Sequence, residues 1–240
     1  MAACLRRHFR ERWIAVVTVS AILSLLVLAM IGGRPQLSSL VWNLFLAWIP
    51  FGLAFVAYQR ARFSISMPAL AVLALLWLLF LPNAPYMITD LRYAHLEYLG
   101  GRHTDQVLYD VVLLSAAALA GLLLALTSLF LMHAVARRRI GVANAWAFVV
   151  GAIALSALGT YFGRVKRWNS WDFFTRPESL VGHAPKGLLH PLYHSRPIAL
   201  TALFASCLLV SYFVFYLFVR IGSPMGEERR RLSSSRPERN

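Results

Sequence analysis

Charged residues are scarce in this chain, and their scarcity excludes a soluble globular protein. Of the 240 residues, 14% are charged and 59% are hydrophobic, whereas about a quarter of the residues of soluble domains are charged. A soluble fold of this length would need many more polar side chains to cover its surface. The apolar residues also form long blocks, as insertion into a bilayer requires.

Cysteine is nearly absent as well. Cys4 lies in the N-terminal tail and Cys207 inside the last apolar block, so we expect no disulfide between them, and no spacing typical of a metal site occurs. The sequence also lacks a phosphate-binding glycine loop, a dinucleotide-binding fingerprint, a nucleophile elbow and the His-Glu-x-x-His motif of zinc proteases. It therefore identifies no cofactor, and we predict no metal site.

The positive charge of the chain, formally +14, raises the question of nucleic-acid binding. Its distribution argues against this function, because most arginines flank apolar blocks and no helix-turn-helix or RNA-binding pattern occurs. Arginines at such positions anchor spanning helices and contact anionic lipids. We therefore expect the lipid bilayer and its anionic lipids as partners, and no nucleic acid.

Six apolar blocks predict an all-α protein, a polytopic bundle of about six transmembrane helices. Each block is close to the ~20 residues that cross the hydrocarbon core as a helix, and the alternating pattern of membrane strands is absent. The chain divides into a basic N-terminal tail (1–12), the transmembrane domain (13–222) and a basic tail expected to be disordered (223–240). The blocks lie at about 13–32, 40–58, 66–82, 107–133, 142–162 and 198–219.

The basic residues also predict the orientation. With the N-terminus inside, the inner segments carry fifteen Lys and Arg and the outer segments nine, which favours both termini in the cytoplasm of a bacterial inner membrane. The short loop at 137–139 is the clearest determinant, whereas the basic residues of the 163–197 loop weaken the prediction. The first block is longer than a usual signal core and lacks an evident cleavage site, so we read it as an uncleaved helix, with a cleaved signal peptide as the alternative.

Polar residues gather in two segments, 83–110 and 163–197, which six spans place on the same side of the membrane. Together they hold six of the ten acidic residues and five of the seven histidines. The first segment has a net charge of −2 and the second of +4, counted on Asp, Glu, Lys and Arg. Because the charges are opposite, we hypothesise that the two segments pack together and share one site.

In the first segment, Pro82 and Pro85 remove two backbone donors and are expected to end the third helix. Asn83 can satisfy the freed backbone groups. The apolar character continues to Ile88, so the chain can remain at membrane depth. Irregular backbone at that depth must be buried in protein or line a cavity. Transporters place their ligands at such broken helices. Asn83 and Tyr86 are candidate substrate-binding residues, and the alternative is an ordinary helix-ending turn with Tyr86 as an interfacial anchor.

Three aspartates, Asp90, Asp110 and Asp172, are candidate catalytic residues. An acid inside a spanning segment indicates function because its burial costs free energy, and Asp110 lies about one turn into the fourth block. The alternative for Asp110 is an acid at a helix N-terminus, favoured by the macrodipole. His133 closes the same block and is expected to lie at the membrane interface.

The second segment combines cations with aromatic and amide side chains. Three cations within four residues can hold a phosphate or carboxylate, and arginine is best suited to bidentate contact. Tryptophans suit the headgroup layer, so a basic and aromatic anchor is the alternative. The candidate substrate-binding residues are Arg164, Arg167, Trp168, Asn169 and Trp171.

Two further patterns have structural interpretations. His190 and His194 have a helical ligand spacing and share a loop with His183, but Pro191 disfavours a helix through them, so we predict solvated side chains rather than a metal site. Small residues four apart, which allow close helix packing, occur in Ala117-x-x-x-Gly121 and Gly159-x-x-x-Gly163.

Several of these motifs are unusual in membrane proteins. They are Leu81-Pro82-Asn83-Ala84-Pro85-Tyr86 with Thr89-Asp90-Leu91, Tyr109-Asp110, and Gly163-Arg164 with Arg167-Trp168-Asn169-Ser170-Trp171-Asp172. Over residues 40–220 the chain resembles an uncharacterised bacterial membrane family, the domain of unknown function DUF1361, although Leu108 stands where that family commonly has an aromatic residue. The resemblance implies a multi-pass helical membrane protein and no known activity, so it assigns no catalytic role.

The polar segments support three functional interpretations. In the first, they form a site that binds or acts on an anionic lipid headgroup or a lipid-linked envelope substrate, with Arg164 and Arg167 holding the anion and an aspartate as general base or orienting group. In the second, the protein is a small transporter with a broken third helix. In the third, it is a structural or accessory subunit that docks a partner membrane protein or a second copy. Whether the protein is an enzyme stays open.

Overall fold

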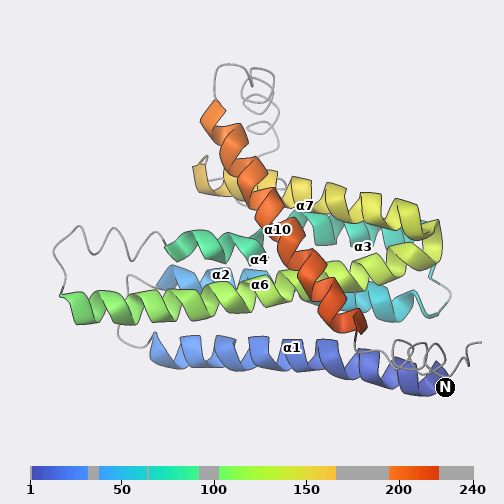
Figure 1. Cartoon of the computed structure of the whole chain (residues 1–240), viewed down its shortest axis with the longest axis horizontal. Helices are drawn as coiled ribbons and strands as arrows, with labels where there is room; N and C mark the ends of the chain where they lie inside the picture. Colours follow the sequence, from blue (N-terminus) through green and yellow to red (C-terminus); the bar gives the residue numbers. More distant parts are fainter. Residues whose placement is uncertain (1, 32–37, 64, 92–102, 166–194, 222–240) are drawn as a thin grey trace, which may run out of the picture.

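The computed structural model describes residues 2–31, 38–63, 65–91, 103–165 and 195–221, and every regular element in these ranges is helical (Figure 1). The predicted all-α class is therefore confirmed. The elements are α1 (Ala2–Met30), α2 (Ser38–Arg60), α3 (Met67–Phe80), α4 (Asn83–Tyr86), the 3₁₀ helix η2 (Met87–Leu91), α6 (Thr104–Ile140), α7 (Val142–Val165) and α10 (Ser195–Ile221).

Six segments of the described chain are long and apolar enough to cross a membrane, as predicted. Their outer surfaces are apolar, and the side chains of Leu25, Leu75 and Val210 are each more than 60% exposed. Leaving so many large apolar side chains in water costs free energy, whereas lipid accommodates them. The six spans are Trp13–Met30, Ser39–Arg60, Met67–Leu91, Thr104–Ile140, Val142–Tyr161 and Ile198–Val219.

The long helix α6 is the centre of the bundle. It packs against α1, α2, α4, η2, α7 and α10, and more of its span is buried than in any other described span. Its first half, from Leu113 to Ala125, shares a core with α1, α2, α4 and η2. Its second half, from Leu126 to Val135, shares another core with α2, α3, α7 and α10.

The chain directions define two ends of the bundle (Figure 1). At the motif end, η2 and α7 end while α6 and α10 begin. At the arginine end, α2 and α6 end while α3 and α7 begin. Both polar segments of the sequence are therefore connected to the motif end.

The arginine end is closed by a tight turn between α6 and α7. Gly141 alone separates the two helices and has a φ of 84°, in the left-handed region that favours glycine. Three arginines, Arg137 to Arg139, occupy the last turn of α6, where cations interact favourably with the helix macrodipole. Asp105 lies in the first turn, where the same macrodipole favours an acid.

Two spans extend beyond the predicted blocks. The third apolar block was expected to reach residue 82, whereas the span continues to Leu91. The fourth was expected at about 107–133, whereas α6 runs from Thr104 to Ile140 because its polar first and last turns remain helical. The C-terminal tail at 223–240 lies outside the described residues.

Candidate functional site

The two prolines end α3, but the chain continues as short helical turns. Pro82 keeps right-handed helical backbone angles, and the Ala84 N–H bonds the Leu81 carbonyl at 3.3 Å, three residues back rather than four. The Phe80 carbonyl thus loses its usual partner. It accepts the side-chain amide of Asn83 at 3.1 Å, so the prediction that Asn83 satisfies a freed backbone group is confirmed.

Two glycines allow this break to pack closely against its neighbouring helices. A Cβ at Gly121 on α6 would overlap the carbonyl oxygen of Ala84 and would lie 2.9 Å from the sulfur of Met87. A Cβ at Gly159 on α7 would lie 2.6 Å from Cγ of Pro82, inside any normal contact. Both glycines come from the small-residue patterns of the sequence, and their packing partner is the broken third span.

After the break, Asp90 lies in the interior of the bundle. Asp90 lies on η2 with 2% of its surface exposed, and its Oδ2 accepts the side-chain amide of Asn43 on α2 at 3.0 Å. Burial of an acid is costly unless it is hydrogen-bonded, so this amide stabilises Asp90 at membrane depth. Asn43 was not among the residues predicted from the sequence, although an amide inside an apolar block is a recognisable signal.

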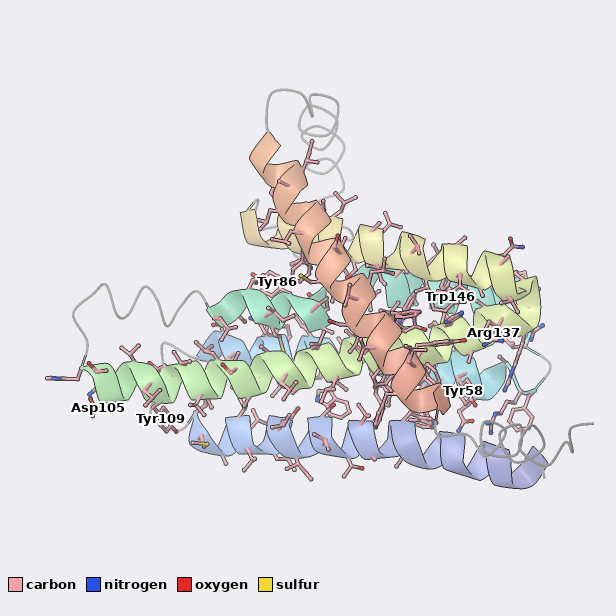
Figure 2. All side chains as sticks on the ribbon, viewed as in Figure 1. Tyr58, Tyr86, Asp105, Tyr109, Arg137 and Trp146 are labelled. Carbon is pink, nitrogen blue, oxygen red and sulfur yellow. The ribbon has the colours of Figure 1, made fainter. Side chains whose placement is uncertain are left out.

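Asp110 is buried as well, with 3% of its surface exposed. Its neighbours at helical spacing, Leu113 and Leu114, belong to the core of the motif end. The exposed acid at the N-terminus of α6 is Asp105. It lies in the first turn of the helix and points outward in Figure 2. Two of the three candidate catalytic aspartates are thus interior residues of one end of the bundle.

Polar side chains also attach α1 to this end. The Tyr109 hydroxyl donates to the Met30 carbonyl at the end of α1, at 2.9 Å. The indole N–H of Trp48 on α2 donates to the Ser24 hydroxyl at 3.3 Å. Tyr86, a candidate binding residue, is half-buried on α4. The two bonds link α1 to α6 and to α2, the helices that carry Asp110 and Asn43.

The second polar segment is described only in part. Arg164 lies in the last turn of α7, and α7 ends at the motif end (Figure 1). Packing between the two segments stays a prediction. The other candidates of this segment lie outside the described residues: Arg167, Trp168, Asn169, Trp171, Asp172, His183, His190 and His194. Within the described ranges, no three His, Cys, Asp or Glu side chains come together as a metal site would require.

A second polar cluster, which the sequence analysis missed, lies at the arginine end. His133 was expected at the membrane interface, but it is 1% exposed, because α6 continues for two more turns and α7 and α10 cover it. Its Nδ1 lies 2.7 Å from the Tyr212 hydroxyl, and its ring packs against Trp146 and Tyr216. Figure 2 shows Trp146 beside Arg137, far from Asp105 and Tyr109. One indication of this cluster in the sequence is that Tyr212 and Tyr216 are four residues apart, which places both side chains on one face of a helix.

Six apolar helices with buried polar side chains define an integral, multi-pass membrane protein. The family model described as "Protein of unknown function (DUF1361)" matches residues 42–217, and the chain therefore belongs to this family, as its motifs indicated. The match includes the break, both buried aspartates and the second polar segment. No curated protein and no solved structure matches the chain.

Proposed function

We propose that the motif end is a membrane-embedded site that binds, or acts on, an anionic lipid headgroup or a lipid-linked envelope substrate. The site comprises the 83–110 and 163–172 segments. The protein is proposed to lie in a bacterial inner membrane with both termini in the cytoplasm. In this orientation the arginine end faces the cytoplasm, because basic residues favour the inner side, and the motif end faces the envelope.

The observation that carries this proposal is the pair of Asp90 and Asn43. Burying a carboxylate inside a spanning segment until it is 2% exposed costs free energy, and residues for which this cost is tolerated mark substrate pathways and active sites. Asn43 holds the carboxylate by one amide hydrogen bond. Asp110 adds a second acid to the same core, which a helix anchor does not require.

The proposed roles follow from charge. Arg164 and Arg167 hold the anionic group, because guanidinium binds phosphate or carboxylate bidentately. Asp90, Asp110 or Asp172 serves as general base or orients a hydroxyl of the substrate. The position of α7 supports this division, since its last turn brings Arg164 to the end of the bundle where η2 carries Asp90.

The structure favours this interpretation over a transporter gated by the broken helix. Pro82 and Ala84 pack on Gly159 and Gly121 so closely that a methyl group on either glycine would collide. A gate at this position would have to give up these contacts each time it moved. The close packing is better suited to a fixed site than to a moving one.

The test is a binding measurement on the full-length protein in detergent. A short-chain polyprenyl phosphate is titrated, and native mass spectrometry counts bound molecules. We expect Arg167→Ala to weaken binding at least about tenfold, since a charge-assisted hydrogen bond contributes about 1.5–3 kcal/mol. Arg34→Ala is the matched control, because Arg34 is predicted on the same side of the membrane but outside both segments of the site. Unchanged affinity in Arg167→Ala, or equal loss in both variants, contradicts the proposal.

A further inference from the structure

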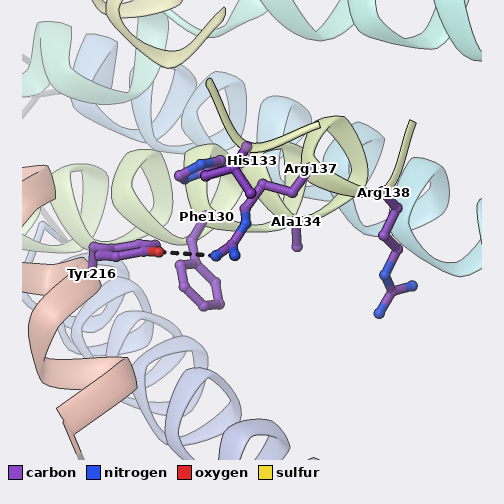
Figure 3. A pocket seen from close by; sticks show the side chains of 7 residues that line it. Phe130, His133, Ala134, Arg137, Arg138 and Tyr216 are labelled. Carbon is purple, nitrogen blue, oxygen red and sulfur yellow. Dashed lines mark hydrogen bonds between the residues drawn. The ribbon is translucent and has the colours of Figure 1, made fainter. Parts of the chain in front are cut away.

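A cavity of about 320 Å³ opens at the arginine end, between α6, the start of α7 and α10 (Figure 3). Its size is at the lower limit of the range of about 300–1,000 Å³ that is typical of ligand pockets. Two arginines, Arg137 and Arg138, line the cavity together with apolar side chains, and Ala134 lies between them in Figure 3. The lining residues are Phe130, His133, Ala134, Arg137, Arg138, Val142 and Tyr216.

The arginines of this region have no acidic partner among the described side chains. Arg137 donates to the Tyr216 hydroxyl at 3.0 Å. Arg138 and Arg62 lie against the ring of Tyr58, at 5.5 and 4.8 Å from its centroid, and Arg62 also donates to the Tyr58 hydroxyl. Each guanidinium has five N–H donors, and the described side chains use only a minority of those of Arg137 and Arg138.

Aromatic rings hold the deeper wall of the cavity in place. The ring of His133 stacks on Tyr216 at a centroid distance of 5.4 Å and meets Trp146 edge-on at 4.7 Å. Its Nδ1 is fixed by the Tyr212 hydroxyl. Its Nε2 is buried and has no hydrogen-bond partner within the described chain, which leaves one polar atom of a lining residue unsatisfied. Such an atom is costly unless a ligand or water pairs with it.

We propose that this cavity binds the phosphate group of a phosphate ester, with Arg137 and Arg138 as its donors. Two guanidinium groups on the wall of one cavity, neither with an acidic partner among the described side chains, provide the positive charge and the N–H donors that bind a phosphate. Phe130, Ala134 and Val142 provide an adjoining apolar wall for carbon atoms next to that phosphate. The site lies at the opposite end of the bundle from the proposed motif-end site and does not depend on it.

The phosphate can come from a lipid headgroup or from a soluble phosphate compound, and the experiment separates these sources. The full-length protein in detergent is titrated with short-chain phosphatidylglycerol, with short-chain phosphatidylcholine and with inorganic phosphate. Native mass spectrometry and the unfolding midpoint report binding. Saturable binding of phosphatidylglycerol at concentrations where inorganic phosphate has no effect identifies a lipid. Equal binding of inorganic phosphate identifies a soluble anion as the source.

Three variants tie the binding to the cavity. Arg137→Gln with Arg138→Gln is expected to weaken binding at least about tenfold. Arg139→Gln, on the same helical turn and outside the cavity wall, is the matched control and should leave affinity unchanged. Ala134→Leu fills the cavity and retains every charge, so it should also lose binding, even if the double variant proves poorly folded.

The affinities of the three variants and of the three probes decide whether the cavity is a phosphate site. Loss of binding in the double variant and in Ala134→Leu, with retention in Arg139→Gln, supports the site. Equal loss in Arg139→Gln would show that surface charge alone attracts the ligand, and the proposal would then be wrong. Equal affinity for phosphatidylcholine, or no saturable binding of any of the three probes, would overturn it as well.

Discussion

The two ends of the bundle carry side chains of opposite charge and differ in how deeply those side chains are buried. Every described carboxylate, Asp90, Asp105 and Asp110, lies at the motif end, and every arginine whose side chain is described lies at the arginine end. At the motif end, two carboxylates are buried among apolar residues and one is fixed by an amide. At the arginine end, the guanidinium groups lie at the rim, over tyrosine rings and hydroxyls.

The contrast follows from the solvation of the two kinds of side chain. A long arginine can keep its charge near the headgroups while its stem and its planar group cover apolar and aromatic surface. A short aspartate cannot reach water from inside a span, so it needs a polar partner at its own depth. Anchoring at the membrane surface explains the positions of the arginines, which keep their charge solvated. Burying the aspartates costs free energy, so their positions require another explanation.

The largest expected effect concerns the sidedness of the two ends. Reporter enzymes active only outside, fused after Gly101 and after Gly187, should both be active, because six spans place both loops on one side and the basic residues face inward. A fusion after Gly141 should be active only with a cytoplasmic reporter. Opposite results after Gly101 and Gly187 would contradict the six-span arrangement and the shared motif-end site.

The next effect tests the close packing of the break. Gly121→Ala should lower the free energy of unfolding by about 1–3 kcal/mol, because the new methyl group overlaps the Ala84 carbonyl and overpacking costs this much. Gly151→Ala is the control, since a Cβ there meets nothing within 4 Å, and it should be neutral or stabilising by about 0.5–1 kcal/mol. Unfolding in mixed micelles measures both. Equal stability of the two variants would contradict the packing.

An effect of similar size is expected from the buried pair. Asn43→Leu should destabilise the protein by about 1–3 kcal/mol, because it leaves the Asp90 carboxylate without its amide donor. The same change at the exposed Asn144, whose amide donates to the carbonyl of Ile140 across the turn between α6 and α7, should stay within about 0.5 kcal/mol. Adding Asp90→Leu to Asn43→Leu should restore part of the loss. Strict additivity of the two substitutions would show that the pair is not coupled.

The smallest effect is expected at the arginine end. Tyr212→Phe removes the partner of the His133 Nδ1 atom and should cost about 1 kcal/mol. In a His133→Phe background the same change should cost less, since no buried nitrogen is then left unpaired. Thermal unfolding of the four proteins of this cycle measures the coupling, and a cost of Tyr212→Phe that is independent of residue 133 would argue against the bond.

Much of the fold was accessible from the sequence, because long apolar blocks and their flanking arginines are local signals. The break was also accessible, since Pro82 and Pro85 remove backbone donors. Its continuation as helical turns was not, because it depends on glycines of two other helices. The partner of Asp90 lies 47 residues away and that of His133 lies 79 residues away. Neither pairing has a local pattern that would predict it.

Helix α6 connects the two ends as a single rod. Its 37 residues span about 55 Å at 1.5 Å per residue, well beyond the hydrocarbon thickness of about 30 Å. Asp110 and His133 are side chains of this one rod, and Gly141 joins its far end directly to α7. A turn of the rod about its own axis would therefore shift Asp110 and Arg137 together. Because Asp110 and Arg137 belong to one continuous helix, α6 sets the positions of the two polar regions relative to each other.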